Sequence, residues 1–263
     1  MIKFTNDLVN NLPRKEISDV YNFLQMKGIE IVGIASINDK GLQKQNQFHP
    51  QEMQENAKSV ICYAIPIPKG IIHSKSHELL LYWRYCNTSY RKLDEIANSL
   101  CVYLEEQKYT STPIYGCYPW KINNNEFSGL THLVYWAEKA GIGKITKSGL
   151  LGHPKYGTRI LLGGVITSRT FPKPKIIEED LCPNDCSKCI DSCPINAISL
   201  SGKVDHNLCI RHSSKNPLMA LALKDMSLKK KYGFERLLNT IGVDDHGTYE
   251  CLECLKVCPL NSR

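Results

Sequence analysis

The sequence contains no apolar run that approaches the ~20 consecutive residues needed to span a lipid bilayer. Its first residues, Met1–Asp7, lack the features of a secretory signal peptide or a twin-arginine leader. A Ser/His/Asp catalytic set, a phosphate-binding loop and a zinc-protease motif are also missing. The sequence therefore offers no motif for nucleophilic hydrolysis or for binding nucleotide phosphates, and apart from two cysteine groups it has no internal repeat.

The composition is ordinary for a globular protein, with 42% hydrophobic and 22% charged residues among 263. This length allows one large domain or two unequal ones, each with a buried core. The net charge of +7 is compatible with an acidic partner, such as tRNA or an acidic electron donor. It is also compatible with nothing more than a lysine-rich genome. Lys229–Lys231 is the only dense basic run, and it fits a solvated helix end.

Cysteine, by contrast, is abundant, and eight of the 12 cysteines lie in the last third of the chain. One group closes on Cys193-Pro194 and the other on Cys258-Pro259, with Cys209 alone between them. Bacterial ferredoxins hold cubane iron–sulfur clusters with runs that end in Cys-Pro, and the cysteine before proline binds the second cluster. Because proline fixes φ and turns the chain, that last thiolate is free to point away from its own group.

Eight thiolates suffice for two four-cysteine sites, so we predict two 4Fe–4S clusters. Structural zinc also uses paired C-x2-C groups, but zinc sites rarely end twice in Cys-Pro and need no crossed ligands. A disulfide scaffold suits short secreted chains rather than this one. Clusters and free thiols both require reducing conditions, so we expect a cytoplasmic protein from an anaerobe or facultative anaerobe. The predicted ligands are Cys182, Cys186, Cys189 and Cys258 for the first cluster, and Cys193, Cys209, Cys251 and Cys254 for the second.

The rest of the sequence alternates between helix and strand patterns, which indicates an α/β (α+β) layered architecture. Apolar residues at helical spacing predict helices over residues 14–27, 79–107 and 129–140. Nearly continuous apolar runs predict strands over residues 29–37, 59–68, 112–118 and 159–167, and the polar residues 40–54 are expected to form a loop. Cys62 is expected to be a small buried hydrophobic residue. The alternating prolines of residues 171–175 predict a linker between an α/β domain (residues 1–170) and a cluster domain (residues 171–263).

Residues 139–151 and 156–167 resemble the central block of epoxyqueuosine reductases, and the cysteine groups agree with that family as far as Cys258–Asn261. The match covers most of residues 60–261. That family in turn resembles corrinoid-dependent reductive dehalogenases. The resemblance implies a nitroreductase-like sheet domain flanked by helices, which binds cobalamin, followed by a bacterial-ferredoxin-like domain with two clusters.

The resemblance also implies a cobalamin-dependent reductase. An external low-potential donor, a ferredoxin or flavodoxin, would supply electrons through the clusters to a corrinoid that reduces a small molecule or tRNA. Cubane potentials as low as about −700 mV suit the reduction of cobalt. Two departures favour the alternative of a non-enzymatic ferredoxin-type carrier or corrinoid-activating partner. Phe127 occupies the position of the family's proton-donating aspartate, and the sequence stops shortly after Cys258, where the family continues into a tRNA-binding helical repeat.

A glycine-rich turn allows the backbone to approach a large planar ligand closely. By the resemblance, the candidate corrinoid-binding residues are Gly141, Gly143, Lys147, Ser148, Gly149 and Leu150. Without the resemblance, a helix C-cap is the simpler explanation of Gly141. A reductive site also needs a proton source, for which the candidate catalytic residues are Glu126 and His132. Glu126 also fits a solvent-facing loop, and His132, one turn into a predicted helix, also fits a core histidine. Weaker candidates for the proton source or an axial ligand are Tyr115, Tyr118, Lys147, His153 and His206.

Overall fold

The computed structural model describes residues 14–38, 49–116, 120–123, 126–215, 248–249 and 251–262. Its centre is a four-stranded sheet with the order β1-β2-β8-β3, in which every neighbouring pair is antiparallel. The strands are β1 (Ile31–Ser36), β2 (Ser59–Pro66), β3 (Ser111–Ile114) and β8 (Ile160–Thr167). The predicted mixture of helices and sheet is therefore confirmed.

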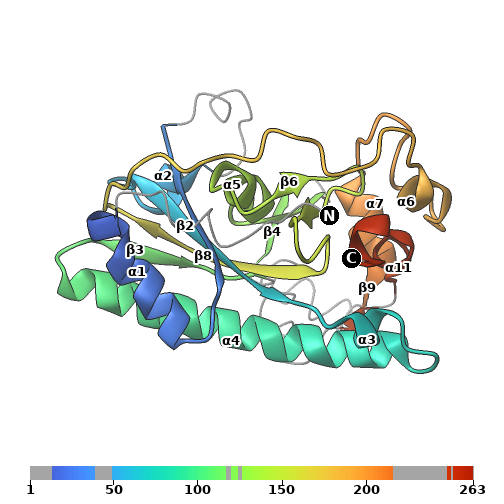
Figure 1. Cartoon of the computed structure of the whole chain (residues 1–263), viewed down its shortest axis with the longest axis horizontal. Coiled ribbons are helices and arrows are strands. Elements are labelled where there is room, and N and C mark those ends of the chain that lie inside the picture. The colour runs from blue at the N-terminus through green and yellow to red at the C-terminus, as the bar shows by residue number, and fades with distance from the viewer. Residues whose placement is uncertain are drawn as a thin grey trace, which may run out of the picture.

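Helices cover both faces of this sheet (Figure 1). The long helix α4 (Glu78–Glu106) lies along one face together with α1 (Arg14–Met26), and α5 (Leu133–Lys139) lies on the other. Successive side chains of a strand point to opposite faces, so a strand between two helical layers must be apolar on both. In β2, Ile61 and Tyr63 join the core beneath α4, and Val60, Cys62 and Ala64 join the core beneath α5. Cys62 is fully buried, as predicted.

The apolar stripe of α4 forms the larger core. The predicted helix and its stripe are confirmed, because Leu93, Ile96, Ala97, Leu100, Cys101 and Leu104 are all buried. The Tyr63 hydroxyl donates a hydrogen bond to the Leu93 carbonyl across 2.9 Å. Gly163 of β8 makes room for this ring, since a Cβ there would lie 2.8 Å from the Tyr63 side chain.

Three predicted boundaries were wrong by more than two residues. The helix expected over residues 129–140 begins at Leu133, because β5 (Glu126–Gly129) pairs instead with β4 (Trp120–Asn123). The end of the predicted loop 40–54 contains a short helix, α2 (Pro50–Met53), and residues 39–48 lie outside the described part. The strand expected to reach residue 118 ends at Ile114.

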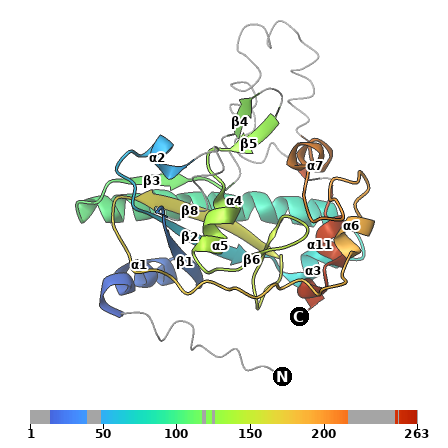
Figure 2. The ribbon, with the colours of Figure 1, turned by 90° about the horizontal axis from the view of Figure 1, so that it is seen from above.

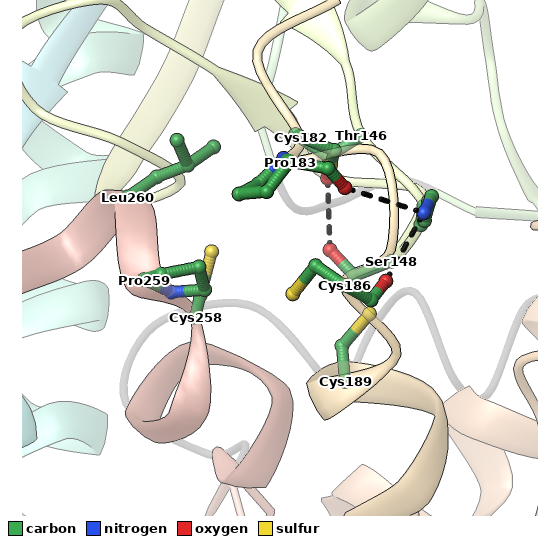
Figure 3. Close-up of a pocket in the computed structure, with 10 residues that line it drawn as sticks. Thr146, Ser148, Cys182, Pro183, Cys186, Cys189, Cys258, Pro259 and Leu260 are labelled. Atoms are coloured by element: carbon green, nitrogen blue, oxygen red, sulfur yellow. Dashed lines mark hydrogen bonds between the residues drawn. The ribbon is translucent and has the colours of Figure 1, made fainter.

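The cysteine-rich part is built from short elements that follow the sheet. They are α6 (Lys188–Asp191), α7 (His206–Ser213), β9 (Ser214–Lys215), β10 (Thr248–Tyr249), α11 (Glu253–Val257) and a 3-10 turn over Pro259–Ser262. Figure 2 shows α6 and α11 near the end of the sheet that carries α3 (Lys69–Ile72). Cys182 lines the same pocket as Thr146 (Figure 3), and Thr146 lies in the turn between β6 (Lys144–Ile145) and β7 (Leu151–Gly152).

The cysteine-rich part also shares a core with the sheet. Leu252 and Leu255 are buried in the same cluster of apolar side chains as the stripe of α4. The Lys256 ammonium lies 3.5 Å from the Glu78 carboxylate at the start of α4. Phe171, within the predicted linker, is buried in that core as well. The segment after β8 is therefore packed against the sheet layer, and the division at residue 170 stays a prediction.

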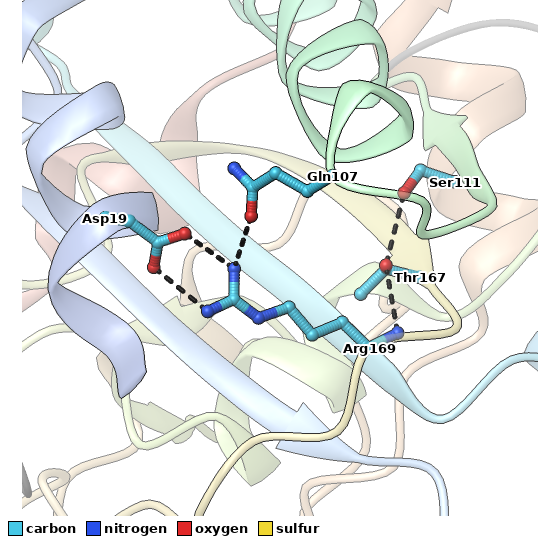
Figure 4. A network of polar contacts seen from close by, with 5 residues as sticks. All are labelled: Asp19, Gln107, Ser111, Thr167 and Arg169. Atoms are coloured by element: carbon cyan, nitrogen blue, oxygen red, sulfur yellow. Dashed lines mark hydrogen bonds and ion pairs between the residues drawn. The ribbon is translucent and has the colours of Figure 1, made fainter. Parts of the chain in front are cut away.

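A polar network joins this segment to two helices (Figure 4). The Arg169 guanidinium donates hydrogen bonds to both carboxylate oxygens of Asp19, at 2.6 and 3.1 Å, and to the Gln107 side-chain oxygen at 3.2 Å. It also lies over the rings of Tyr109 and Phe171. Arg169 therefore connects α1, the end of α4 and the chain that leaves β8.

We expect Arg169→Met to lower the free energy of unfolding by about 1–2 kcal/mol, because a partly exposed, charge-assisted pair would be lost. Burial raises the pKa of the Asp19 carboxyl. The hydrogen bond and the charge of Arg169 lower it by a larger amount, so the net shift is downward from 3.8. A depressed pKa stabilises the fold above the unfolded value and loses that contribution as pH falls through the folded value. Urea denaturation of the wild type and the variant at about pH 7 and about pH 2.5 measures the difference in their free energies of unfolding. That difference should shrink at the lower pH. Equal destabilisation at both values would show that the ion pair is not the source.

Candidate metal centre

Four cysteines from distant parts of the chain line one pocket. Cys182 and Cys186 lie in the loop before α6, Cys189 lies on α6, and Cys258 follows α11. Figure 3 shows the side chains of Cys186, Cys189 and Cys258 turned toward a common space. The structure thus brings together the set predicted to bind the first cluster, including the crossed residue Cys258.

The Cys-Pro pair explains how Cys258 reaches this pocket. A residue before proline is disfavoured in the α region because its backbone clashes with the proline ring. Cys258 is extended, with φ −66° and ψ 120°, and α11 ends at the residue before it. Pro259 then opens the final 3-10 turn. The chain therefore turns at Cys258 and carries the thiol across to the first group.

The other four cysteines lie near one another as well. Burial and the charges of Cys251 and Cys193 raise the pKa of the Cys209 thiol. Burial and the charges of Cys209 and Cys251 raise the pKa of Cys254 to about 12. The charge of Cys189 from the first group also contributes to that shift, and α6 packs against α11. The two groups of thiols therefore lie side by side.

The crowded thiols are suited to a positively charged centre. Burial, then the charges of Cys182, Cys258 and Cys186, raise the pKa of Cys189, so free thiolates would repel one another there. An iron core offsets that repulsion, and soft thiolates are the ligands that iron–sulfur clusters use. Within the described residues, no three His, Cys, Asp or Glu side chains surround a single-ion position. A cubane binds each thiolate at a different iron, so its ligands need not converge on one point.

Two predicted corrinoid-binding residues lie at the first thiol pocket. Lys147 and Ser148, in the turn between β6 and β7, both line it. The Lys147 ammonium donates hydrogen bonds to the carbonyl oxygens of Asn184 at 2.9 Å and Cys186 at 3.1 Å. The Ser148 hydroxyl lies 2.9 Å from that of Thr146. Lys147 therefore contacts the loop that carries Cys182 and Cys186, and Ser148 contacts Thr146 at the wall of the same pocket.

The three predicted glycines are packed against protein atoms. Gly141 has φ +77° and caps α5, since its N–H bonds to Glu138 and the next N–H bonds to Ala137 in a Schellman motif. A Cβ at Gly143 would collide with the Gly152 carbonyl across the hairpin, and one at Gly149 would lie 3.0 Å from Val204. Packing of the chain accounts for these positions, and a corrinoid contact by the turn stays a prediction.

The two predicted catalytic residues precede α5 in the chain. His132 is the N-cap of α5 rather than a residue inside it, because the helix begins later than expected. Burial and the charge of His206 lower the pKa of His132, so these two histidines are neighbours. Glu126 opens β5 and pairs with Asn123. A role in proton transfer stays a prediction for Glu126 and His132.

Two of the weaker candidates, His153 and Tyr115, make hydrogen bonds of their own. His153 accepts hydrogen bonds at Nδ1 from the N–H groups of Lys155 and Tyr156, and burial lowers its pKa to about 4, so it is neutral at neutral pH. The Tyr115 hydroxyl donates to the Asn98 side chain. Leu150 packs against the α4 core, and Tyr118 lies outside the described residues.

The structure adds two residues that sequence analysis did not single out. Asn261 is fully buried, accepts a hydrogen bond from the Thr158 N–H at 2.8 Å and donates one to the Leu255 carbonyl at 2.8 Å. Burial raises the pKa of the Cys258 thiol, and the Leu260 backbone and the nearby Thr158 side chain lower it in part. The Thr158 hydroxyl itself donates a hydrogen bond to the Asn261 side-chain oxygen at 3.3 Å. The sequence blocks that resemble known reductases contain both residues, which is the one feature that pointed to them.

Part of the chain is similar in sequence to epoxyqueuosine reductases. No protein-family model matches the sequence. The chain is 32% identical over 127 residues to the epoxyqueuosine reductase of Bacillus subtilis, a match that covers 48% of this chain and 28% of that enzyme. It is 34% identical over 125 residues to that of Listeria monocytogenes, with the same coverage of each chain. The resemblance to epoxyqueuosine reductases is confirmed. The match spans less than a third of the length of these relatives.

The fold is shared with an epoxyqueuosine reductase and with a reductive dehalogenase. The epoxyqueuosine reductase of Streptococcus thermophilus superposes with a TM-score of 0.57 at 19% identity, covering 95% of this chain and 66% of that one. A reductive dehalogenase described as B12-dependent superposes with a TM-score of 0.59 at 16% identity, covering 99% of this chain and 34% of that one. At these identities the likeness establishes the fold. In the part of the chain that the structure describes, no helix has the length and apolar character to cross a membrane.

Proposed function

We propose that this chain is an iron–sulfur reductase that uses two 4Fe–4S clusters and a corrinoid to reduce an organic substrate. The observation that carries the proposal is the pocket shared by Cys182, Cys186, Cys189 and Cys258, whose last member crosses over from the second cysteine group. The fold shared with a B12-dependent dehalogenase supports the corrinoid. Sequence similarity to epoxyqueuosine reductases supports the reductase class.

Different residues of the chain would hold the clusters and support their ligands. When bound, clusters and corrinoid supply one-electron carriers and a reducing metal centre. The eight cysteines would hold the clusters, and the nearness of Cys189 and Cys254 would put the two sites within reach of one another. Thr158 and Asn261, which hydrogen-bond each other beside Cys258, would support its sulfur at the first site. Electrons from a ferredoxin or flavodoxin would enter at the second site and leave from the first.

The substrate that the relatives suggest is a modified tRNA. One solved epoxyqueuosine reductase, with a TM-score of 0.55 at 21% identity, contains an epoxyqueuosine-modified tRNA stem loop, and the net charge of +7 suits a nucleic acid. Nucleoside analysis of tRNA from a deletion strain tests this substrate. Queuosine should fall and epoxyqueuosine should accumulate, and an unchanged queuosine content would exclude the substrate.

A second function is favoured by one residue. Phe127 stands where the resembling family places its proton-donating aspartate. A chain without that donor suits a ferredoxin-type carrier or an activator of another protein's corrinoid. This alternative predicts reduction of a partner's corrinoid without turnover of any small molecule.

Anaerobic purification decides whether the cofactors are present. We expect about eight iron and about eight sulfide per chain, a brown colour with broad visible absorption, and loss of the base-on spectrum of added cobalamin on binding. Metal analysis and visible titration measure all three. A colourless, zinc-loaded protein would overturn the whole proposal. A protein that takes iron but binds no form of cobalamin would overturn the corrinoid part and leave the electron carrier.

A further inference from the structure

The turn between β6 and β7 projects Lys147 onto the first cysteine loop. The ammonium nitrogen of Lys147 lies 2.9 Å from the Asn184 carbonyl, 3.1 Å from that of Cys186 and 3.5 Å from that of Pro183. An ammonium group has three N–H donors and no acceptor. Three carbonyl oxygens therefore match its full donor capacity, and all three belong to the loop that carries two of the thiols.

The turn that carries Lys147 is held in place by hydrogen bonds of its own. The Thr146 N–H and hydroxyl both bond to the Leu150 carbonyl, at 2.9 and 2.8 Å, and the Gly149 N–H bonds to the Thr146 carbonyl at 2.9 Å. Gly149 has φ +76°, which favours glycine at this point of the turn. Lys147 is therefore presented to the cysteine loop by a defined turn rather than by a free chain.

We propose that Lys147 is a positioning residue of the first iron–sulfur site, which fixes the Cys182–Cys186 loop and raises the reduction potential of the cluster. The inference rests on the proposed function. A cluster bound by four thiolates gains a further negative charge on reduction, and net charge nearby is one of the factors that set its potential. A fixed cation at the wall of the pocket favours the reduced state.

This assignment differs from the roles expected for Lys147 from the sequence. A corrinoid ligand or a proton donor must present an N–H to another molecule. Here the N–H groups are directed at backbone carbonyls of the cysteine loop. The hairpin of the sheet layer and the cysteine-rich part are thereby joined at the first site.

Reductive titration followed by electron paramagnetic resonance tests the role in the loaded, full-length protein. Lys147→Met should make reduction of the first cluster about tenfold less favourable, which is a fall of about 59 mV for a one-electron couple, and leave the second cluster unchanged. Iron should also leave the first site faster under an iron chelator. Signals are assigned to each cluster by comparison with Cys189→Ala.

Two further variants separate charge from position. Lys144→Met is the matched control, since Lys144 lies on the same hairpin but pairs with Glu138. Lys147→Arg keeps the charge, but its planar guanidinium fits three carbonyls poorly, so it should restore most of the potential while iron release stays fast. If Lys147→Met fails to load the first cluster while the second remains, the loop has lost its support, and the arginine variant then reports the effect on potential.

The outcomes distinguish this inference from the function on which it rests. Wild-type protein without clusters would overturn the proposed function itself. Wild-type protein with two clusters, in which Lys147→Met matches Lys144→Met in both potential and iron release, would overturn the role of Lys147 alone.

Discussion

Replacing Cys189 with alanine is expected to halve the iron content of anaerobically prepared protein, from about eight to about four atoms per chain. Cys189 lies on α6, is 9% exposed and lines the pocket with the three other thiols of the first group. A cubane deprived of one of its four thiolates loses a corner ligand and is open to solvent. The second group keeps all four of its cysteines, so one cluster should remain.

Cys62→Ala is the matched control for this experiment. Cys62 is a fully buried thiol of β2, far from the cysteine groups in the sequence and packed beneath α5. Its loss should cost about 1 kcal/mol of stability and leave the iron content unchanged. Iron and sulfide analysis with visible spectra provides the measurement. Full iron retention in Cys189→Ala, or equal iron loss in both variants, would contradict the ligand assignment.

Asn261→Ala is expected to lower the free energy of unfolding by about 3 kcal/mol and to release the first cluster. The substitution removes the partners of the buried Thr158 N–H and the Leu255 carbonyl, and each unsatisfied buried group costs about 1–3 kcal/mol. Thr158 also lies near the Cys258 thiol, and its hydroxyl is held by Asn261, so the surroundings of that ligand loosen with the loss of Asn261. Anaerobic urea denaturation and iron release to a chelator measure the two effects.

The adjacent residue provides the control. Ser262 is exposed, and its hydroxyl bonds only locally, to the Pro259 carbonyl at 2.7 Å. Ser262→Ala should therefore change stability by less than about 0.5 kcal/mol and keep both clusters. A loss of stability in Asn261→Ala without faster iron release would separate the buried amide from the metal site and limit its role to folding.

Local patterns in the sequence determined much of the secondary structure. The stripe of α4 and the apolar runs of β2 and β8 follow from side-chain periodicity, which each element carries within its own residues. The predicted cysteine sets also rest on local pattern, because the spacing and the Cys-Pro pairs imply which thiol leaves its own group. The structure brings the first of these sets to one pocket.

Tertiary contacts decided the rest. The antiparallel order β1-β2-β8-β3, the pairing of β5 with β4 that places His132 at a helix start, and the buried Asn261 all depend on residues far apart in the chain. Lys147 is the clearest case. Nothing in the sequence around a lysine in a glycine-rich turn indicates which loop supplies the carbonyl oxygens that it binds. Periodicity and spacing record what each segment prefers by itself, whereas the partner of a buried or charged group is set only when the segments pack together.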